Sequence, residues 1–147
     1  MAARILGETY ELMKEMEQVR LDQARESLDE AKALLAEGMD IGFVLTNLFY
    51  AFYYPILAIM NEGQVPTTMQ SITIGLFDQQ FIKAGAFRQE YADAVHRVFT
   101  LKPKCCGEKT PVSADEVNML LALAQDFIAD AEEHCTLLTD QGDRRSV

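Results

Sequence analysis

A long uncharged stretch in the middle of the chain is the feature that most constrains its fold. Residues 41–61 (IGFVLTNLFYAFYYPILAIMN) carry no charge over 21 positions, and Glu62 is the only charged residue between Asp40 and Asp78. A helix that is apolar on all sides is normally buried, either in a protein core or in a membrane. The stretch is long enough to span a bilayer, so both alternatives have to be weighed.

Three features of this stretch argue against a membrane span. Tyr50, Tyr53 and Tyr54 lie in its middle, whereas tyrosines of membrane helices gather at the two interfaces. Its flanks are acidic and carry no nearby Lys or Arg, and Thr46 and Asn47 are polar positions within it. We therefore expect a helix over about 41–62 that is buried in protein and has no membrane contact.

Length and charge limit the class of function. The chain has 147 residues, enough for one domain with a real core. Its formal net charge of −10 argues against broad binding to a nucleic-acid backbone, which depends on neutralising phosphates with Lys and Arg. Three cysteines, two of them adjacent, predict no disulfide framework and suit a reducing compartment. Residues 1–20 contain no continuous apolar segment, so we expect no signal peptide and a cytoplasmic location.

Helical periodicity dominates the rest of the chain. Apolar residues recur every three or four positions over 21–35, and Gly38 stands where a helix C′ residue would be. The residues before them have a similar phase, and we predict two helices with a break near residue 19. Another helix is predicted over about 87–101. The strongest local signal opens the last helix, where Ser113 and Glu116 can cap each other's backbone amides.

A further helix after Pro66 is left open by the sequence. The pair Thr67 and Gln70 has the spacing of a weak capping box, whereas the β-branched run at 71–75 is a poor helix former. The pattern as a whole predicts an all-α, up-and-down antiparallel bundle of about five helices. We divide the chain into an N-terminal helical extension (1–19), the bundle (20–138) and a frayed tail (139–147).

The uncharged middle also bears on the oligomeric state. A domain of this size buries one face of a central helix easily, but seldom all faces of it together with the next fifteen uncharged residues. Most soluble oligomers are symmetric, and two-fold dimers are the commonest. We therefore predict a homodimer through residues 41–77.

Four segments, in this order along the chain, fit one family pattern. Asn47–Tyr54 (NLFYAFYY) resembles an "RxYYAxFH" segment, Glu62–Thr68 resembles a turn after a long second helix, and Phe77–Gly85 resembles an "F…xFVKxG" run. Residues 111–116 match the start of a last helix. Together, over about 20–138, they resemble the HEPN domain family (higher eukaryote and prokaryote nucleotide-binding). The resemblance implies a small helical bundle that dimerises, with a minimal nucleotidyltransferase as a partner in a toxin–antitoxin-type system.

Many members of that family are metal-independent RNases with an Arg four to six residues before a His. In such a pair the cation holds the phosphate while the imidazole exchanges protons. The histidines here are His96 and His134, and no Arg precedes either at that spacing; Met69 stands where a related subgroup has its His. The sequence therefore favours a catalytically inactive binding or regulatory module. An RNase toxin with altered catalytic residues is the alternative.

The first group of candidate binding residues lies inside the uncharged stretch. Asn47, Tyr50 and Tyr54 are three and four positions apart, so they share one helix face. They can line a dimer cleft that binds a nucleotide, RNA or a partner. The structural alternative is that they satisfy buried hydrogen bonds within the dimer interface.

The second group is the cationic cluster near the end of the 87–101 helix, formed by Arg97, Lys102 and Lys104 with Lys109. Its functional interpretation is a contact to phosphate or RNA, which stays open. The alternative is that these cations favour the helix dipole and keep a loop soluble, with Arg97 paired to Asp93. In an RNase, Lys102 and Lys104 with Tyr50 or Tyr54 would carry the chemistry.

Metal and cofactor sites are not predicted. Cys105 and Cys106 are adjacent, which is not the spacing of structural zinc, and His134 and Cys135 point in different directions on a helix. His96 is expected to be solvated on the outer side of its helix. No catalytic residue, metal or cofactor is therefore assigned.

Overall fold

The computed structural model describes the backbone of residues 2–60, 69–103 and 112–145, and the side chains of 11–60, 69–103 and 112–136. Within these ranges all regular structure is helical: α1 (Ala2–Ala36), α2 (Ile41–Ile59), α3 (Gln70–Phe77), the π-helix η2 (Asp78–Ile82), α4 (Gln89–Leu101) and α5 (Ala114–Arg145). The predicted all-α bundle of about five helices is confirmed. Dimerisation stays a prediction.

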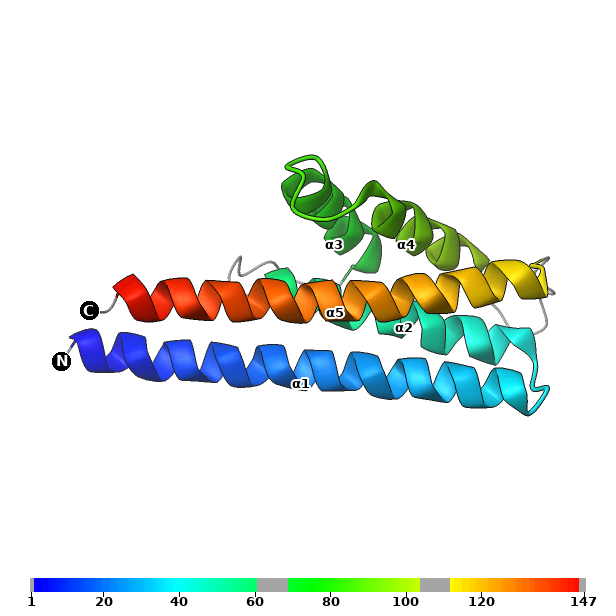
Figure 1. Ribbon diagram of the computed structural model, residues 1–147, viewed down its shortest axis with the longest axis horizontal. Helices are drawn as coiled ribbons and strands as arrows, with labels where there is room; N and C mark the ends of the chain where they lie inside the picture. Colours follow the sequence, from blue (N-terminus) through cyan, green and yellow to red (C-terminus); the bar gives the residue numbers. More distant parts are fainter. Residues whose placement is uncertain (1, 61–68, 104–111, 146–147) are drawn as a thin grey trace.

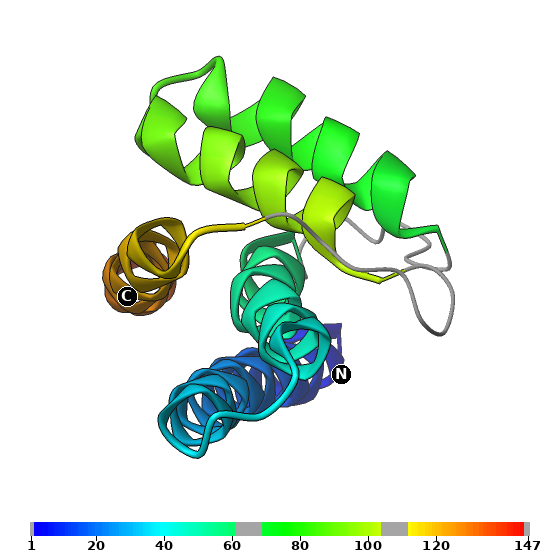
Figure 2. The same cartoon turned by 90° about the vertical axis from the view of Figure 1, so that its right-hand side faces the viewer.

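The helices form two layers. In the first, α1 and α5 run side by side in opposite directions with α2 against both, and the two chain ends lie at the same end of the molecule (Figure 1). In the second, α3 with η2 and α4 form an antiparallel pair that crosses α2 on the side away from α1 (Figure 2). The central position in the fold therefore belongs to α2, the uncharged helix.

A single chain buries most, but not all, of α2. Eleven of its 19 residues are buried, because α1, α4 and α5 pack on different sides of it. The helix Ile41–Ile59 is long and apolar enough to cross a membrane by length and composition alone, and over half of its apolar window is buried against other helices. Burial of this kind is what the core helix of a soluble protein shows. The chain does not cover every face of this helix, since Phe43 is 59% exposed and Asn47, Tyr50 and Tyr54 are only half-buried.

The break predicted near residue 19 was also wrong, because α1 is one continuous helix. Glu17 lies on its core face, 3% exposed, in line with the apolar residues that follow it. Lys14 neutralises this carboxylate at 3.1 Å and also donates to the carbonyl oxygen of Cys135 on α5 at 3.0 Å. The buried face of α1 therefore continues through Glu17, because Lys14 compensates the charge of the buried carboxylate.

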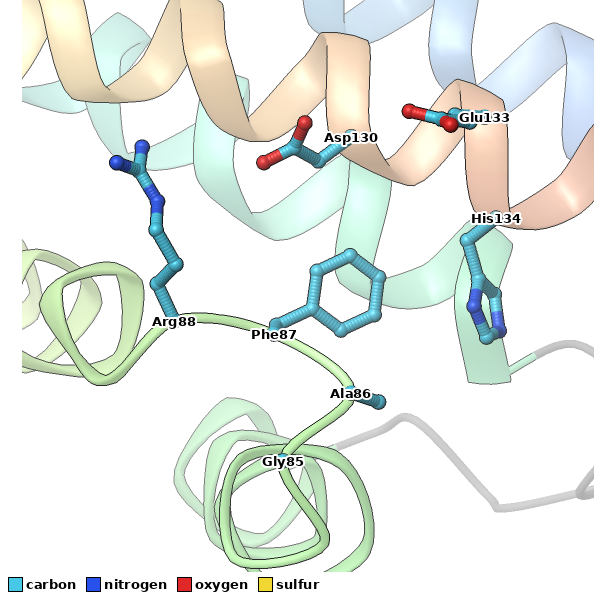
Figure 3. Close-up of a pocket in the computed structure, with 7 residues that line it drawn as sticks. All are labelled: Gly85, Ala86, Phe87, Arg88, Asp130, Glu133 and His134. Carbon is cyan, nitrogen blue, oxygen red and sulfur yellow. The ribbon is translucent and has the colours of Figure 1, made fainter.

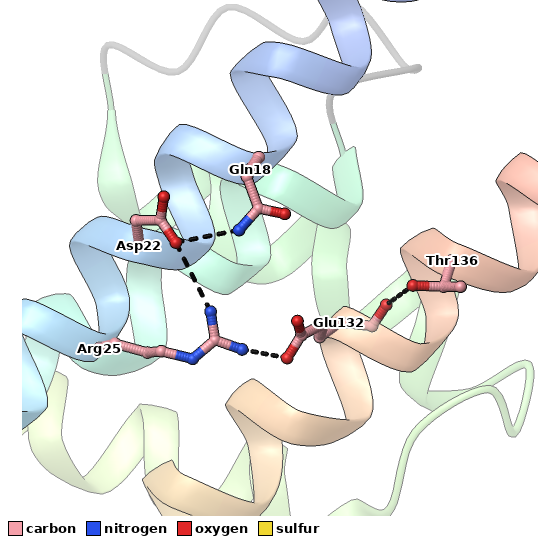
Figure 4. Close-up of polar contacts among 5 residues, drawn as sticks. All are labelled: Gln18, Asp22, Arg25, Glu132 and Thr136. Carbon is pink, nitrogen blue, oxygen red and sulfur yellow. Dashed lines mark hydrogen bonds and ion pairs between the residues drawn. The ribbon is translucent and has the colours of Figure 1, made fainter.

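A second set of polar contacts ties α1 to α5 further along (Figure 4). The guanidinium of Arg25 pairs with Glu132 across the two helices and lies 3.6 Å from Asp22 on its own helix. Gln18 donates to Asp22 at 2.9 Å. These contacts and the Lys14 contacts fix which face of α1 is turned toward α5.

The helix ends follow local signals closely. Gly38 has φ +73, and the amides of Gly38 and Met39 bond back to Leu35 and Leu34, which is a Schellman motif. At the start of α5, the amide of Glu116 donates to Ser113 Oγ at 3.1 Å, as predicted. The α5 backbone is helical to Arg145 beside the first turns of α1, whereas we expected residues 139–147 to fray.

The open question of a third helix is settled in favour of α3, despite its β-branched residues. Thr73, Ile74 and Phe77 are buried, so tertiary packing outweighs weak helix propensity here. Thr67, which we considered as its cap, lies outside the described residues. The helix predicted over about 41–62 begins at Ile41 and ends at Ile59, and residues 61–62 lie outside the described residues.

Candidate functional site

The candidate residues of α2 lie on a side of that helix that the neighbouring helices cover only in part. Asn47, Tyr50 and Tyr54 are half-buried, and the Tyr50 and Tyr54 rings stack with their centroids 5.4 Å apart. The Asn47 amide donates to the carbonyl oxygen of Phe43 at 3.0 Å. Phe43 itself is 59% exposed and extends the same face by one turn. We call Phe43, Asn47, Tyr50 and Tyr54 the α2 face.

Two cations from other elements lie beside aromatic rings of α2. The Arg20 guanidinium from α1 is 5.9 Å from the centroid of the Tyr54 ring. Lys102 Nζ, just after α4, is 4.1 Å from the centroid of the Phe49 ring and donates to Gln70 Oε1 at 2.7 Å. Both arrangements are cation–π contacts. The structure therefore brings Lys102 to α2, as part of the packing between α2, α3 and α4.

Arg97 is not brought to the α2 face. It forms a two-point ion pair with Glu116 of α5, with Nε–Oε1 at 2.6 Å and Nη2–Oε2 at 3.2 Å. These hydrogen bonds raise the pKa of Arg97 and lower the pKa of Glu116. Asp93, the partner that the sequence suggested, accepts from Gln89 instead. Glu116 therefore faces Arg97 and does not reach back to Ser113, so the predicted box is only half formed.

The remaining candidates add little to this face. Lys104 and Lys109 lie outside the described residues, as do Cys105 and Cys106. His96 was expected to be solvated; it is 54% exposed at its side chain but pairs with Asp78 of η2. Cys135 is buried on the core side of α5. Across 11–60, 69–103 and 112–136, no group of three or more His, Cys, Asp or Glu side chains is placed to hold a metal.

A pocket that sequence reasoning missed opens between the turn before α4 and the second half of α5 (Figure 3). It has a volume of about 320 Å³ and is lined by Gly85, Ala86, Phe87, Arg88, Asp130, Glu133 and His134. The His134 ring lies against Phe87, with centroids 5.3 Å apart. An Arg and a His thus share a pocket although they are far apart in sequence, which is why a search for close spacing could not pair them.

A buried tyrosine holds the polar side of this pocket together. Tyr91 is fully buried, and its hydroxyl accepts from Arg88 Nη2 at 2.7 Å and donates to the Asp130 carboxylate. Burial and the bond to Asp130 raise the pKa of Tyr91 to about 12. Arg88 also lies 3.6 Å from Asp126. Since acidic groups outnumber the one guanidinium here, the pocket repels a phosphate more than it attracts one.

The raised pKa of Tyr91 predicts a loss of stability at alkaline pH. An unfolded tyrosine titrates near pH 10, and the folded one near 12, so the folded state holds its proton longer. The stabilisation is complete below pH 10 and disappears between pH 10 and 12, by roughly 3 kcal/mol in total. The free energies of unfolding of the native protein and of Tyr91→Phe, measured in urea, should approach each other as the pH rises over this range. Parallel pH profiles of the two proteins would contradict the assignment.

No family model matches the chain. Over 112 residues it is 25% identical to a protein of Thermotoga maritima named "UPF0332 protein", and the aligned part covers 76% of this chain and 84% of that relative. The name of the relative states no activity. This chain is thus similar to an uncharacterised protein over most of its length, and its function has to be argued from the site.

Proposed function

We propose that this protein is a HEPN-like binding or regulatory module of the cytoplasm, without RNase activity, that works through contacts with other protein chains. The proposal rests on the residue types and the exposure of the α2 face. This face offers an exposed phenylalanine and two half-buried, stacked tyrosines, which are residues typical of protein interfaces. The two members of the predicted cationic cluster that the structure describes are already engaged, Arg97 by Glu116 and Lys102 by Gln70.

The homodimer through residues 41–77 is part of this proposal. Eight large apolar side chains are exposed among those described, and four of them cluster in or beside this stretch: Met39, Phe43, Met69 and Ile72. The α2 face and the start of α3 are then the surfaces that a second copy covers. The partner implied by the family resemblance is a minimal nucleotidyltransferase, with the two proteins forming a toxin–antitoxin-type pair. No membrane contact belongs to the proposal.

The alternative, an RNase toxin, has one observation in its favour. Arg88 and His134 line the same pocket, and a guanidinium with an imidazole is the combination that cleaves RNA without a metal. Against it, Arg88 is bound to Tyr91 and lies near Asp126, and Glu133 adds a further negative charge. We therefore rank the binding role first.

One set of purified proteins tests the proposal. The native chain should sediment at twice its 16.5 kDa mass at micromolar concentration. Phe43→Glu with Ile72→Glu should sediment as a monomer, because two charges enter an apolar interface. Met119→Glu is the matched control, since Met119 is 54% exposed on α5, outside the stretch. The control should stay dimeric.

The same preparations test for RNase activity. Single-stranded RNA incubated with the native protein should stay intact, and cells that overproduce it should grow normally and contain abundant soluble protein. A monomeric native protein would contradict the dimer. RNA cleavage or toxicity that disappears in Lys102→Ala with Lys104→Ala, or in His134→Ala, would favour the RNase instead.

A further inference from the structure

A second exposed apolar surface lies on α1, in the two turns before Arg20, whose guanidinium lies beside the Tyr54 ring of the α2 face. Leu12, Met16 and Val19 are 60%, 51% and 54% exposed. They are four and three positions apart, so they form one continuous stripe along the helix. Leu21 and Ala24 are buried and mark the core face of the same helix. Because successive residues are rotated by 100°, the core face and the stripe point in clearly different directions. We call Leu12, Met16 and Val19 the α1 stripe.

The α1 stripe is bordered on one edge by acidic residues. Glu11, Glu15, Asp22 and Glu26 follow each other along this edge, and all four are exposed. Asp22 is paired with Arg25, whereas no ion pair is recorded for Glu11, Glu15 or Glu26 in the described part of the chain. Residues 1–37 hold nine acids and five bases, a net charge of −4, so the surroundings of the stripe are negative as well.

The orientation of the stripe is fixed by the opposite face of α1. Lys14 and Glu17 are joined to each other, and Lys14 reaches the backbone of α5. Arg25 holds Glu132 of α5 one and a half helical turns beyond Val19 (Figure 4). Because these contacts prevent α1 from rotating, the stripe cannot turn inward to bury itself. A rigid, preformed apolar face loses little entropy on binding.

We propose that the α1 stripe docks an amphipathic helix of a different protein, one that carries apolar residues at three- and four-residue spacing and Lys or Arg along one edge. Three exposed apolar residues along one side of a helix form a surface on which another helix can dock. The acidic edge selects a basic partner through charge complementarity. A second copy of this chain is a poor occupant, because residues 1–37 carry a net charge of −4 in both copies and would repel each other. The inference rests on the proposed binding role and adds the chemistry of the partner.

The probe for this surface is a pair of synthetic amphipathic helical peptides. Both have leucines at i, i+3, i+4 and i+7; one has lysines beside them and the other has glutamates. Fluorescence anisotropy with the full-length protein at low salt should show binding of the lysine peptide and at least about tenfold weaker binding of the glutamate peptide. Leu12→Ser with Met16→Ser and Val19→Ser should weaken binding of the lysine peptide at least about tenfold.

Two controls separate this surface from the others. Met119→Ser removes an equally exposed apolar side chain and should bind the lysine peptide like the native protein. Phe43→Glu with Ile72→Glu should also bind it, because the dimer surface is not the peptide site, so loss of the dimer and loss of peptide binding are independent results. If the triple variant does not fold by circular dichroism, Glu11→Gln with Glu15→Gln and Glu26→Gln carries the test by abolishing the preference for lysine.

Three results would overturn the inference: equal binding of the two peptides, unchanged binding by the triple variant, or conversion of the native dimer to a monomer by the triple variant. The last result would assign the stripe to a second copy of the chain.

Discussion

Replacing Phe127 by Ala should lower the free energy of unfolding by about 3–5 kcal/mol. Phe127 on α5 is fully buried at the junction of the two helix layers. Its ring lies 5.0 Å from the centroid of Tyr91, 5.6 Å from those of Phe77 and Phe87, and 6.1 Å from that of Phe52. Removing it leaves a cavity among four rings on three helices and one connecting turn, which cannot all move in to fill the space.

Chemical unfolding at one fixed protein concentration measures this effect, since a dimer makes stability depend on concentration. Met119→Ala is the matched control on the same helix. Met119 is exposed, so its loss should change the unfolding free energy by no more than about 0.5 kcal/mol. A loss below about 1.5 kcal/mol for Phe127→Ala would mean that the α3–α4 pair does not pack on α5 as described.

Replacing Lys14 by Met should cost about 3 kcal/mol. The change removes the ammonium group that lies 3.1 Å from the Glu17 carboxylate, whose side chain is 4% exposed. Breaking a buried ion pair at one partner typically costs about 3–5 kcal/mol, because a charge stays buried without compensation. We expect the low end of this range, since Lys14 keeps 20% of its side-chain exposure.

The double variant Lys14→Met with Glu17→Leu shows how much of the lost stability comes from the buried Glu17 charge and how much from lost packing. With both charges removed, the α1–α5 contact becomes apolar, and the double variant should recover most of the stability lost in Lys14→Met. The comparison uses the same unfolding experiment. A double variant as unstable as Lys14→Met would show that the Lys14 contact to the Cys135 carbonyl, rather than the Glu17 charge, carries the energy.

Local signals in the sequence were read correctly at two helix ends, where the interacting groups are close along the chain. Ser113 caps the amide three residues on, and Gly38 closes α1 through amides that bond back three and five residues. Such contacts depend on the backbone within about one turn, so residue types at fixed spacing are enough to predict them.

The sequence failed where the deciding partner is distant. The predicted break near residue 19 does not exist, because Glu17 stays on the core face of α1, where its partner Lys14 binds α5 more than a hundred residues later. Arg97 was expected to pair within its own helix, and Glu116 competes for it from another. The pocket that joins Arg88 and His134 has no local pattern at all.

By itself, the sequence determined that this is a helical protein with an uncharged central helix, because helical periodicity and charge are properties of the chain read a few residues at a time. Only the tertiary structure decided how much of that helix a single chain covers, and which apolar residues stay exposed on α1 and on the α2 face. Burial depends on the packing of helices that meet from distant parts of the chain, and no spacing rule contains that information.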